Sequence, residues 1–173
     1  LKALLQYLAV DLDGIFGNTI SVSAATIFMF VMFGAFLEAS GCSQFINDLA
    51  LSLTGKLRCG PALAAVVASA LMGCINGSAV ANVVGTGTFT IPLMKSRGYK
   101  PEFASGVEAV ASTGGQILPP VMGSGAFLMV IFTSVSYANI VKAAVIPAVL
   151  YFLGAGIAVA FVSTIYGVGL ANL

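Results

Sequence analysis

The sequence predicts an all-α polytopic membrane protein with a re-entrant helical hairpin and a discontinuous transmembrane helix. Of its 173 residues, 59% are hydrophobic and 8% are charged, whereas about a quarter of the residues in soluble domains are charged. One long uncharged stretch lies between two groups of basic residues, and helix-breaking residues interrupt two apolar segments. Because helices satisfy their own backbone hydrogen bonds in lipid, this composition indicates a chain made mainly of membrane helices.

The first part of the chain is expected to hold one complete membrane span followed by a helix along the membrane surface. Residues 1–14 resemble the tail of a preceding helix, so we expect the chain to be a truncated part of a longer protein. Residues 19–38 form an apolar run of membrane-spanning length. Residues 43–57 are apolar on one helical face and polar on the other, which is typical of a helix in the cytoplasmic interface. This helix is either an ordinary connector or an arm that holds a moving domain.

The uncharged stretch, residues 61–95, predicts a hairpin that enters and leaves the membrane by the same face. Basic residues flank it on both sides, and such residues mark cytoplasmic loops. Each limb of roughly 16 residues would reach about 24 Å, short of the ~30 Å hydrocarbon core, so the polar run from Asn76 to Asn82 forms a tip inside the bilayer. The alternative is one span and one buried helix, with the loop at Arg97 outside. The flanking basic residues are Lys56, Arg58, Lys95, Arg97 and Lys100.

The next segment, residues 101–135, is expected to be a membrane helix that is broken in its middle. Two adjacent glycines lower its helix propensity, and the pair Pro119-Pro120 removes backbone donors and clashes with carbonyls one turn earlier. We expect the helix to unwind from Ala111 onwards, which leaves carbonyl groups in need of protein, water or a cation. Residues 139–167 form the last expected span.

The two interruptions indicate a site for ions or solutes, because irregular backbone at membrane depth is tolerated where it is buried in protein or lines a water-filled cavity. Secondary transporters build such sites from discontinuous helices, with helix N-termini facing anions and exposed carbonyls facing sodium. Glu108 lies inside the second interrupted segment, where a carboxylate is costly and usually functional. It is either part of a proton or cation relay or an interfacial residue near basic side chains.

Other classes of function find little support in the residues. The chain contains no His, so Ser124, which lies between two glycines, has no base for nucleophilic catalysis, and we expect no enzyme. The three cysteines form no paired motif, so we expect no transition-metal site. No basic block is available for nucleic acid, and no organic cofactor is expected.

Several motifs carry a resemblance through their order and spacing: Gly60-Pro61, Asn76 to Val84, Thr88 to Lys95, Pro101 to Phe103, and Glu108 to Gly123. Together they closely resemble the large membrane subunit of TRAP transporters, and more narrowly the fused permeases that work with a TAXI-type binding protein. The most specific part is the run from Ser112 to Pro120, and the resemblance extends from Asp13 to Gly167. It implies an ion-transporter-like fold in which this chain is the first of two inverted repeats, each with a hairpin and a broken helix.

The resemblance also implies a function: sodium-driven, elevator-type import of small organic anions such as dicarboxylates, with Na+ as the coupling ion. Oxygen donors suit a hard cation, and the hairpin tip and the helix break supply them. The alternative interpretation is that these small residues only allow close helix packing. The residues expected at sodium are Gly77, Ser78, Ser112, Gly114 and Gly115. Those expected at the substrate are Asn82, Thr113 and Gln116.

The implied partners are a periplasmic TAXI-type solute-binding protein, a small permease subunit or fused segment, and the second repeat. The implied location is the inner membrane of a bacterium or the cell membrane of an archaeon. Two alternatives stay open: a sodium/anion symporter that needs no binding protein, and a membrane scaffold subunit that transports nothing.

Overall fold

The computed structural model describes the whole chain except residues 1, 3–8, 10–16, 58 and 166–173. The described residues form helices and no strand, which agrees with the predicted all-α class. Most of the expected tail at 1–14, the basic residue Arg58 and the last two residues of the expected span at 139–167 lie outside the described residues.

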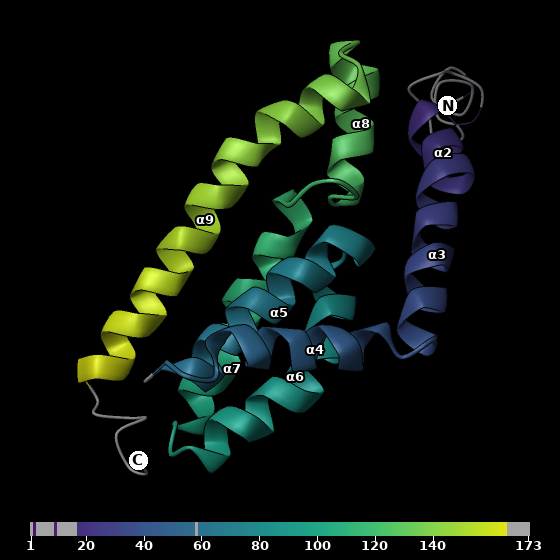
Figure 1. Cartoon of the computed structure of the whole chain (residues 1–173). Helices are drawn as coiled ribbons and strands as arrows, with labels where there is room; N and C mark the ends of the chain where they lie inside the picture. The colour runs from purple at the N-terminus through teal and green to yellow at the C-terminus, as the bar shows by residue number, and fades with distance from the viewer. Residues whose placement is uncertain (1, 3–8, 10–16, 58, 166–173) are drawn as a thin grey trace.

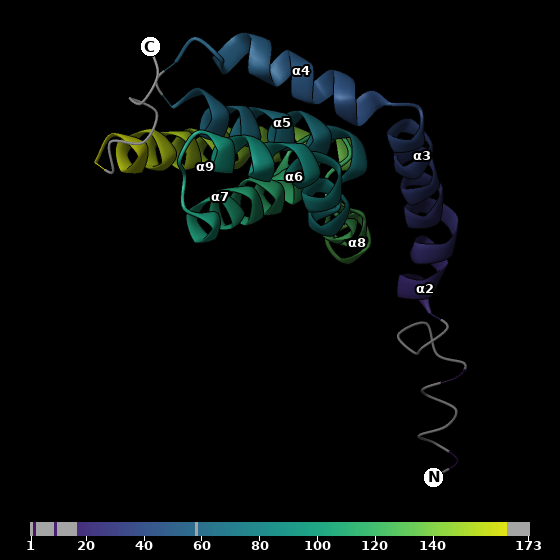
Figure 2. The same ribbon diagram turned by 90° about the horizontal axis from the view of Figure 1, so that it is seen from below.

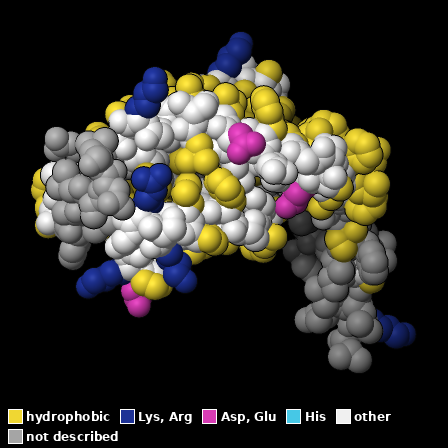
Figure 3. Space-filling model, turned by 60° about the horizontal axis from the view of Figure 1, so that its bottom comes forward, with side chains coloured by type: hydrophobic (Ala, Val, Ile, Leu, Met, Phe, Trp, Pro, Cys, Tyr) yellow, Lys and Arg dark blue, Asp and Glu magenta, His cyan; other side chains and the backbone are white. Residues whose placement is uncertain are grey.

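The described part includes a helical column at one edge of the molecule (Figures 1 and 2), where it contacts helices that follow it in the chain. The column runs through α2 (Asn18–Val22), a π-helical stretch η1 (Ser23–Ile27) and α3 (Phe28–Ala39). Of the residues in α3, only Gly34 is buried. Many large apolar side chains are exposed along the column, and Figure 3 shows hydrophobic surface on the face in view. The segment Ile20–Ala39 is long and apolar enough to cross a membrane.

A sharp turn at Gly41, whose φ is +87°, leads into α4 (Cys42–Thr54). Figure 2 shows α4 lying across one side of the helices that follow it. Ile46 and Ala50 are buried in a cluster with residues of the next helix. Phe45 is among the apolar side chains of α4 that remain exposed, which suits a helix at the membrane surface.

Three helices pack against one another in the centre of the molecule: α5 (Gly60–Asn76), α6 (Ala79–Ser96) and α7 (Pro101–Gly114). The first two form a helical hairpin with its tip at Gly77 and Ser78. Pro61 in the first turn of α5 and Pro101 at the start of α7 occupy positions that favour proline, because the missing N–H has no partner there. Four buried alanines of α5 let the helices approach closely; they are Ala62, Ala64, Ala65 and Ala68.

The chain then makes one 3-10 turn, η2 (Gly115–Ile117), and continues through an irregular segment to α8 (Ser124–Thr133). The last described helix, α9 (Tyr137–Ile165), runs back along the central helices and packs on α5 and α7 (Figure 1). It is the second described helix that is long and apolar enough to cross a membrane.

Candidate functional site

Four helix ends meet where the hairpin tip lies against the irregular segment after α7. Helix α5 ends at Asn76 and α6 begins at Ala79, while α7 ends at Gly114 and α8 begins at Ser124. The two breaks are packed together: a Cβ on Gly77 would lie 1.8 Å from the carbonyl oxygen of Met122. The two interruptions predicted from the sequence therefore form one structural junction.

The hairpin tip is built by a left-handed glycine and two short polar side chains. Gly77 has φ +59°, a conformation in which glycine carries no steric penalty and commonly ends a helix. Ser78 is extended, and its hydroxyl accepts a hydrogen bond from Ala81 N at 3.4 Å as the N-cap of α6. Asn76 Oδ1 accepts a hydrogen bond from Ser78 N at 3.2 Å, which ties the two sides of the tip together.

The break after α7 begins later than the sequence suggested. We expected unwinding from Ala111, but α7 stays helical to Gly114, and Ser112 O and Thr113 O both accept from Gly115 N. The physical reason is the reach of the proline: the ring of Pro119 conflicts with the carbonyl four residues earlier, at Gly115, and no further back. Leu118, which precedes the proline, is extended with ψ 121°.

Glycine allows the two breaks to touch through their backbones. A Cβ on Gly73 would lie 2.3 Å from the Cα of Gly115, and a Cβ on Gly115 would lie 2.9 Å from Asn82 Nδ2. A backbone hydrogen bond also joins the two ends of the irregular segment: Gly123 N donates to Gln116 O at 2.7 Å. These contacts leave no room for larger residues at the junction.

A pocket of about 210 Å³ opens at the junction. The hairpin tip, η2, the irregular segment, the first turn of α8 and the column of η1 and α3 supply its walls. None of its lining residues carries a charge, and Asn76, Ser78, Gln116 and Ser124 supply the polar side chains. The apolar side chains in its walls belong to Ile27, Phe30, Val31, Val121, Met122 and Phe127.

Three residues expected at the site, Gly77, Ser78 and Gln116, line this pocket. Asn82 is fully buried beneath the tip, where its Nδ2 donates to Ser69 O at 2.8 Å. Thr113 is exposed, and its hydroxyl donates to Ala109 O of its own helix at 2.7 Å. The structure therefore does not bring the Thr113 side chain to the pocket.

The remaining expected sodium residues lie around the junction rather than in the pocket wall. Gly115 touches Gly73, and a Cβ on Gly114 would lie 2.3 Å from the ring of Tyr151 in α9. Ser112 is buried, and its hydroxyl donates to Glu108 Oε1 at 3.1 Å.

A cluster of hydroxyl groups surrounds Glu108 in the core between α5, α6 and α7. Glu108 has no exposed surface, and its described hydrogen bonds go to hydroxyl groups rather than to the basic side chains considered from the sequence. Ser69 donates to its Oε1 at 3.1 Å, Thr90 donates to its Oε2 at 2.5 Å, and Thr86 also bonds to Oε1. These bonds join all three central helices.

The partners of Glu108 were not identified from the sequence, although a signal was present. Asn82, Thr86 and Thr90 follow one another at intervals of four residues, which places three polar side chains on one face of an apolar helix. All three are buried and face the core.

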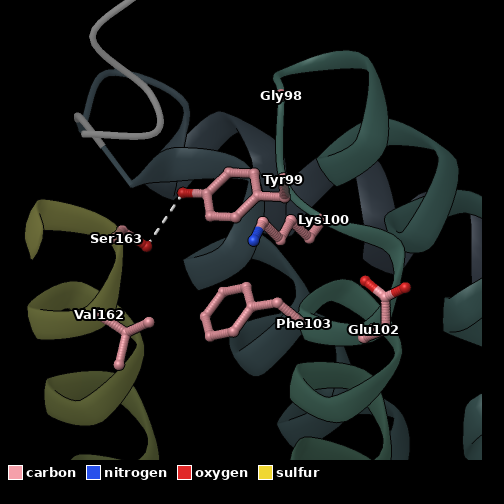
Figure 4. A pocket seen from close by; sticks show the side chains of 7 residues that line it. All are labelled: Gly98, Tyr99, Lys100, Glu102, Phe103, Val162 and Ser163. Carbon is pink, nitrogen blue, oxygen red and sulfur yellow. Dashed lines mark hydrogen bonds between the residues drawn. The ribbon is translucent and has the colours of Figure 1, made fainter. Parts of the chain in front are cut away.

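A second pocket of about 270 Å³ lies at the opposite end of the hairpin, beside the loop between α6 and α7 (Figure 4). Tyr99 is buried in this loop, and its hydroxyl donates to Ser163 Oγ of α9 at 3.1 Å. Its ring stacks on Phe103, with 5.7 Å between the ring centroids. Burial raises the pKa of Tyr99 above its ordinary value, and the hydrogen bond to Ser163 offsets only part of this rise. This pocket holds none of the expected site residues.

The family model described as "Tripartite ATP-independent periplasmic transporter, DctM component" matches residues 3–171. The chain belongs to this family. This membership confirms the resemblance to the large TRAP permease subunit and implies a protein of the bacterial inner membrane.

Several curated relatives of this TRAP family chain are named as TRAP transporter permeases. One is a C4-dicarboxylate TRAP transporter large permease protein of Vibrio cholerae, 33% identical over 124 residues, which are 70% of this chain and 26% of the relative. Another, the 2,3-diketo-L-gulonate TRAP transporter large permease protein of Escherichia coli, is 33% identical over 58% of this chain and 24% of its own length. An isethionate TRAP transporter permease protein, DctMQ, of Oleidesulfovibrio alaskensis is 36% identical over 53% of this chain and 14% of its own length. The chain spans about a quarter or less of the length of these relatives.

Proposed function

We propose that this chain is part of a sodium-coupled secondary transporter that imports small organic anions by elevator-type alternating access. The observation that carries the proposal is the meeting of four helix ends at one uncharged pocket. The N-termini of α6 and α8 carry partial positive charge and suit a carboxylate, whereas the carbonyl ends of α5 and α7 suit a sodium ion. The junction therefore presents helix N-termini to the substrate anion and helix C-termini to sodium.

The proposed ligands follow from this arrangement. Gly77 and Ser78 offer oxygens for sodium at the tip, with the carbonyls of Gly114 and Gly115 on the other side of the junction. Gln116 lies in the pocket wall and is placed to contact the substrate. The further residues proposed for sodium and substrate, Ser112, Asn82 and Thr113, contribute if their side chains leave their present partners on binding.

The names of the relatives support the substrate class, because dicarboxylate, isethionate and diketogulonate permeases all act on acids. The proposed partners are a periplasmic solute-binding protein of the TAXI type, a small permease subunit or fused segment, and a second repeat of related design. The relative named DctMQ supports a fused arrangement, and the TAXI branch is proposed from the resemblance of the sequence as a whole.

The proposed path of the hairpin is re-entrant. At 17 and 18 residues, α5 and α6 would each be about 26 Å long, less than the ~30 Å hydrocarbon core. Single-cysteine variants that retain Cys59 or carry Ser96→Cys should react with a membrane-impermeant maleimide only after cell lysis. Labelling of Ser96→Cys in intact cells, with Cys59 protected, would mean that the stretch is a simple span.

The transport proposal is tested with the assembled permease in proteoliposomes, by measuring uptake of small carboxylates with and without an inward sodium gradient. Ser78→Ala should raise the sodium concentration needed for half-maximal uptake. The matched control is Ser105→Ala, whose exposed hydroxyl donates to Pro101 O of its own helix. Uptake that does not depend on sodium would refute the coupling. Uptake without the binding protein would favour the symporter that needs no binding protein. The absence of uptake for every acid would favour a scaffold subunit.

A further inference from the structure

The hairpin tip contains a buried hydrogen-bond donor that no described residue satisfies. Asn76 Nδ2 is shielded from solvent and has no acceptor in the described part of the chain. The identity of the atom is fixed, because Asn76 Oδ1 accepts from Ser78 N at 3.2 Å and the amide nitrogen must therefore point the other way. Buried amide donors without a partner are rare in native structures, so each one calls for an explanation.

Neighbouring backbone prevents Asn76 from withdrawing into solvent. The residue is packed against α3, since a Cβ on Gly34 would lie 3.5 Å from both Asn76 Cα and Asn76 Cβ. Asn76 is also the last residue of α5, and the bond to Ser78 N holds its amide across the tip. The donor is therefore held at the junction.

The surroundings of the side chain favour an anionic acceptor. Asn76 lines the junction pocket together with Ser78, which immediately precedes α6, and Ser124, which is the first residue of α8. Helix α8 has no side chain capping its N-terminus, so its first N–H groups also lack side-chain acceptors. No residue in the pocket wall carries a charge that would compete for these donors or pair with a ligand.

We propose that Asn76 binds the transported anion, with Nδ2 donating a hydrogen bond to a carboxylate oxygen, and that it contributes to the selection of carboxylates. This inference rests on the proposed function, because it names a residue of the same site. The bond from Ser78 N to Oδ1 is kept, and small side-chain adjustments of the kind that commonly accompany binding open Nδ2 to the ligand. The ligand then supplies the acceptor that the described residues lack.

Asn76→Asp is the decisive variant, because it keeps shape and the acceptor for Ser78 N but replaces the donor with a charged acceptor. Uptake is measured with the assembled permease for a panel of small carboxylates, succinate among them, and the best acid is compared with its neutral amide. Loss of a hydrogen bond to a charged group predicts a rise in KM of about 10-fold or more for the acid. The matched control, Asn139→Asp, places the same charge at an exposed position in α9 and should leave KM unchanged.

The possible outcomes separate this inference from the function on which it rests. If the unaltered permease takes up no acid of the panel, the proposed function fails and the inference fails with it. If it takes up an acid and Asn76→Asp leaves KM unchanged, or Asn139→Asp raises KM equally, the inference alone is wrong. Should Asn76→Asp not fold, Asn76→Ala removes the donor without adding charge, and an unchanged KM in that variant overturns the inference as well.

Discussion

Gly73 of α5 and Gly115 of the helix break lie in direct backbone contact. A Cβ added to Gly73 would lie 2.3 Å from Gly115 Cα and 3.1 Å from its carbonyl carbon. These neighbours are backbone atoms, which cannot turn away as the end of a flexible side chain can. The contact therefore sets the distance between the hairpin and the break, and with it the shape of the pocket beside them.

Gly73→Ala should separate the two breaks and abolish uptake. Overpacking of this kind costs about 1–3 kcal/mol, so the temperature of unfolding of the purified permease should fall as well. The measurements are sodium-dependent uptake in proteoliposomes and thermal unfolding followed by circular dichroism.

Gly106→Ala is the matched control for this change. Gly106 also lies in a central helix, α7, but no atom of the described residues lies within 4 Å of a Cβ placed on it. Because alanine favours a helix by roughly 1 kcal/mol over glycine, Gly106→Ala should keep both activity and stability. Equal behaviour of the two variants would show that the contact at Gly73 is unimportant.

Glu108→Ala should destabilise the central helices by about 2–4 kcal/mol, because it removes the acceptor of several buried hydroxyl groups and leaves a cavity. Glu108→Gln keeps the shape, one acceptor oxygen and a donor for Thr90, and it should retain most of the stability. Comparison of the two unfolding temperatures measures how much the hydrogen bonds around Glu108 contribute.

The control for both variants is Glu102→Ala, which removes an exposed carboxylate from the first turn of the same helix. Its effect should stay within about 1 kcal/mol, the usual value for a charge near a helix N-terminus. A loss at Glu102 as large as the loss at Glu108 would contradict the structural role of the buried cluster.

The sequence predicted the helical class and the two interruptions because glycine, proline and short polar residues act on the local backbone. The tip at Gly77 and the proline-induced end of α7 are of this kind. The sequence did not predict which polar side chains face each other, because that depends on how three helices pack. Thr113 and Ser112 are neighbours in the chain, yet one is exposed and the other is buried at Glu108. The start of the break was expected too early, at Ala111, because the ring of Pro119 affects the backbone only as far back as Gly115.

Tyr99→Phe should lower stability by about 1 kcal/mol, the usual contribution of one hydrogen bond. The phenol hydroxyl donates to Ser163 Oγ, which itself donates to Val159 O at 2.7 Å, so the loop between α6 and α7 is tied to α9. The stacking on Phe103 is retained in the variant (Figure 4). Tyr151→Phe removes a hydroxyl that donates to Val110 O at 2.8 Å, a bond between α9 and α7. Comparison of the two unfolding temperatures measures how much each of these two hydrogen bonds made by α9 contributes to stability. A Tyr99→Phe protein as stable as the unaltered one would show that this bond contributes nothing.

Gly77→Ala should abolish transport, and backbone strain at this position is not enough to account for the whole loss. A residue other than glycine in the left-handed conformation costs roughly 1–2 kcal/mol, and the added Cβ would also lie 1.8 Å from Met122 O. Gly41→Ala separates the two effects, because Gly41 has φ +87° but no described neighbour within 4 Å of its Cβ position. Both variants should lose stability through backbone strain, whereas only Gly77→Ala forces the hairpin tip away from the segment before α8. Sodium-dependent uptake, corrected for the amount of folded permease, should therefore persist in Gly41→Ala and disappear in Gly77→Ala. If uptake falls by the same factor in both, strain in the turn is sufficient and close contact between the two breaks is not required for transport.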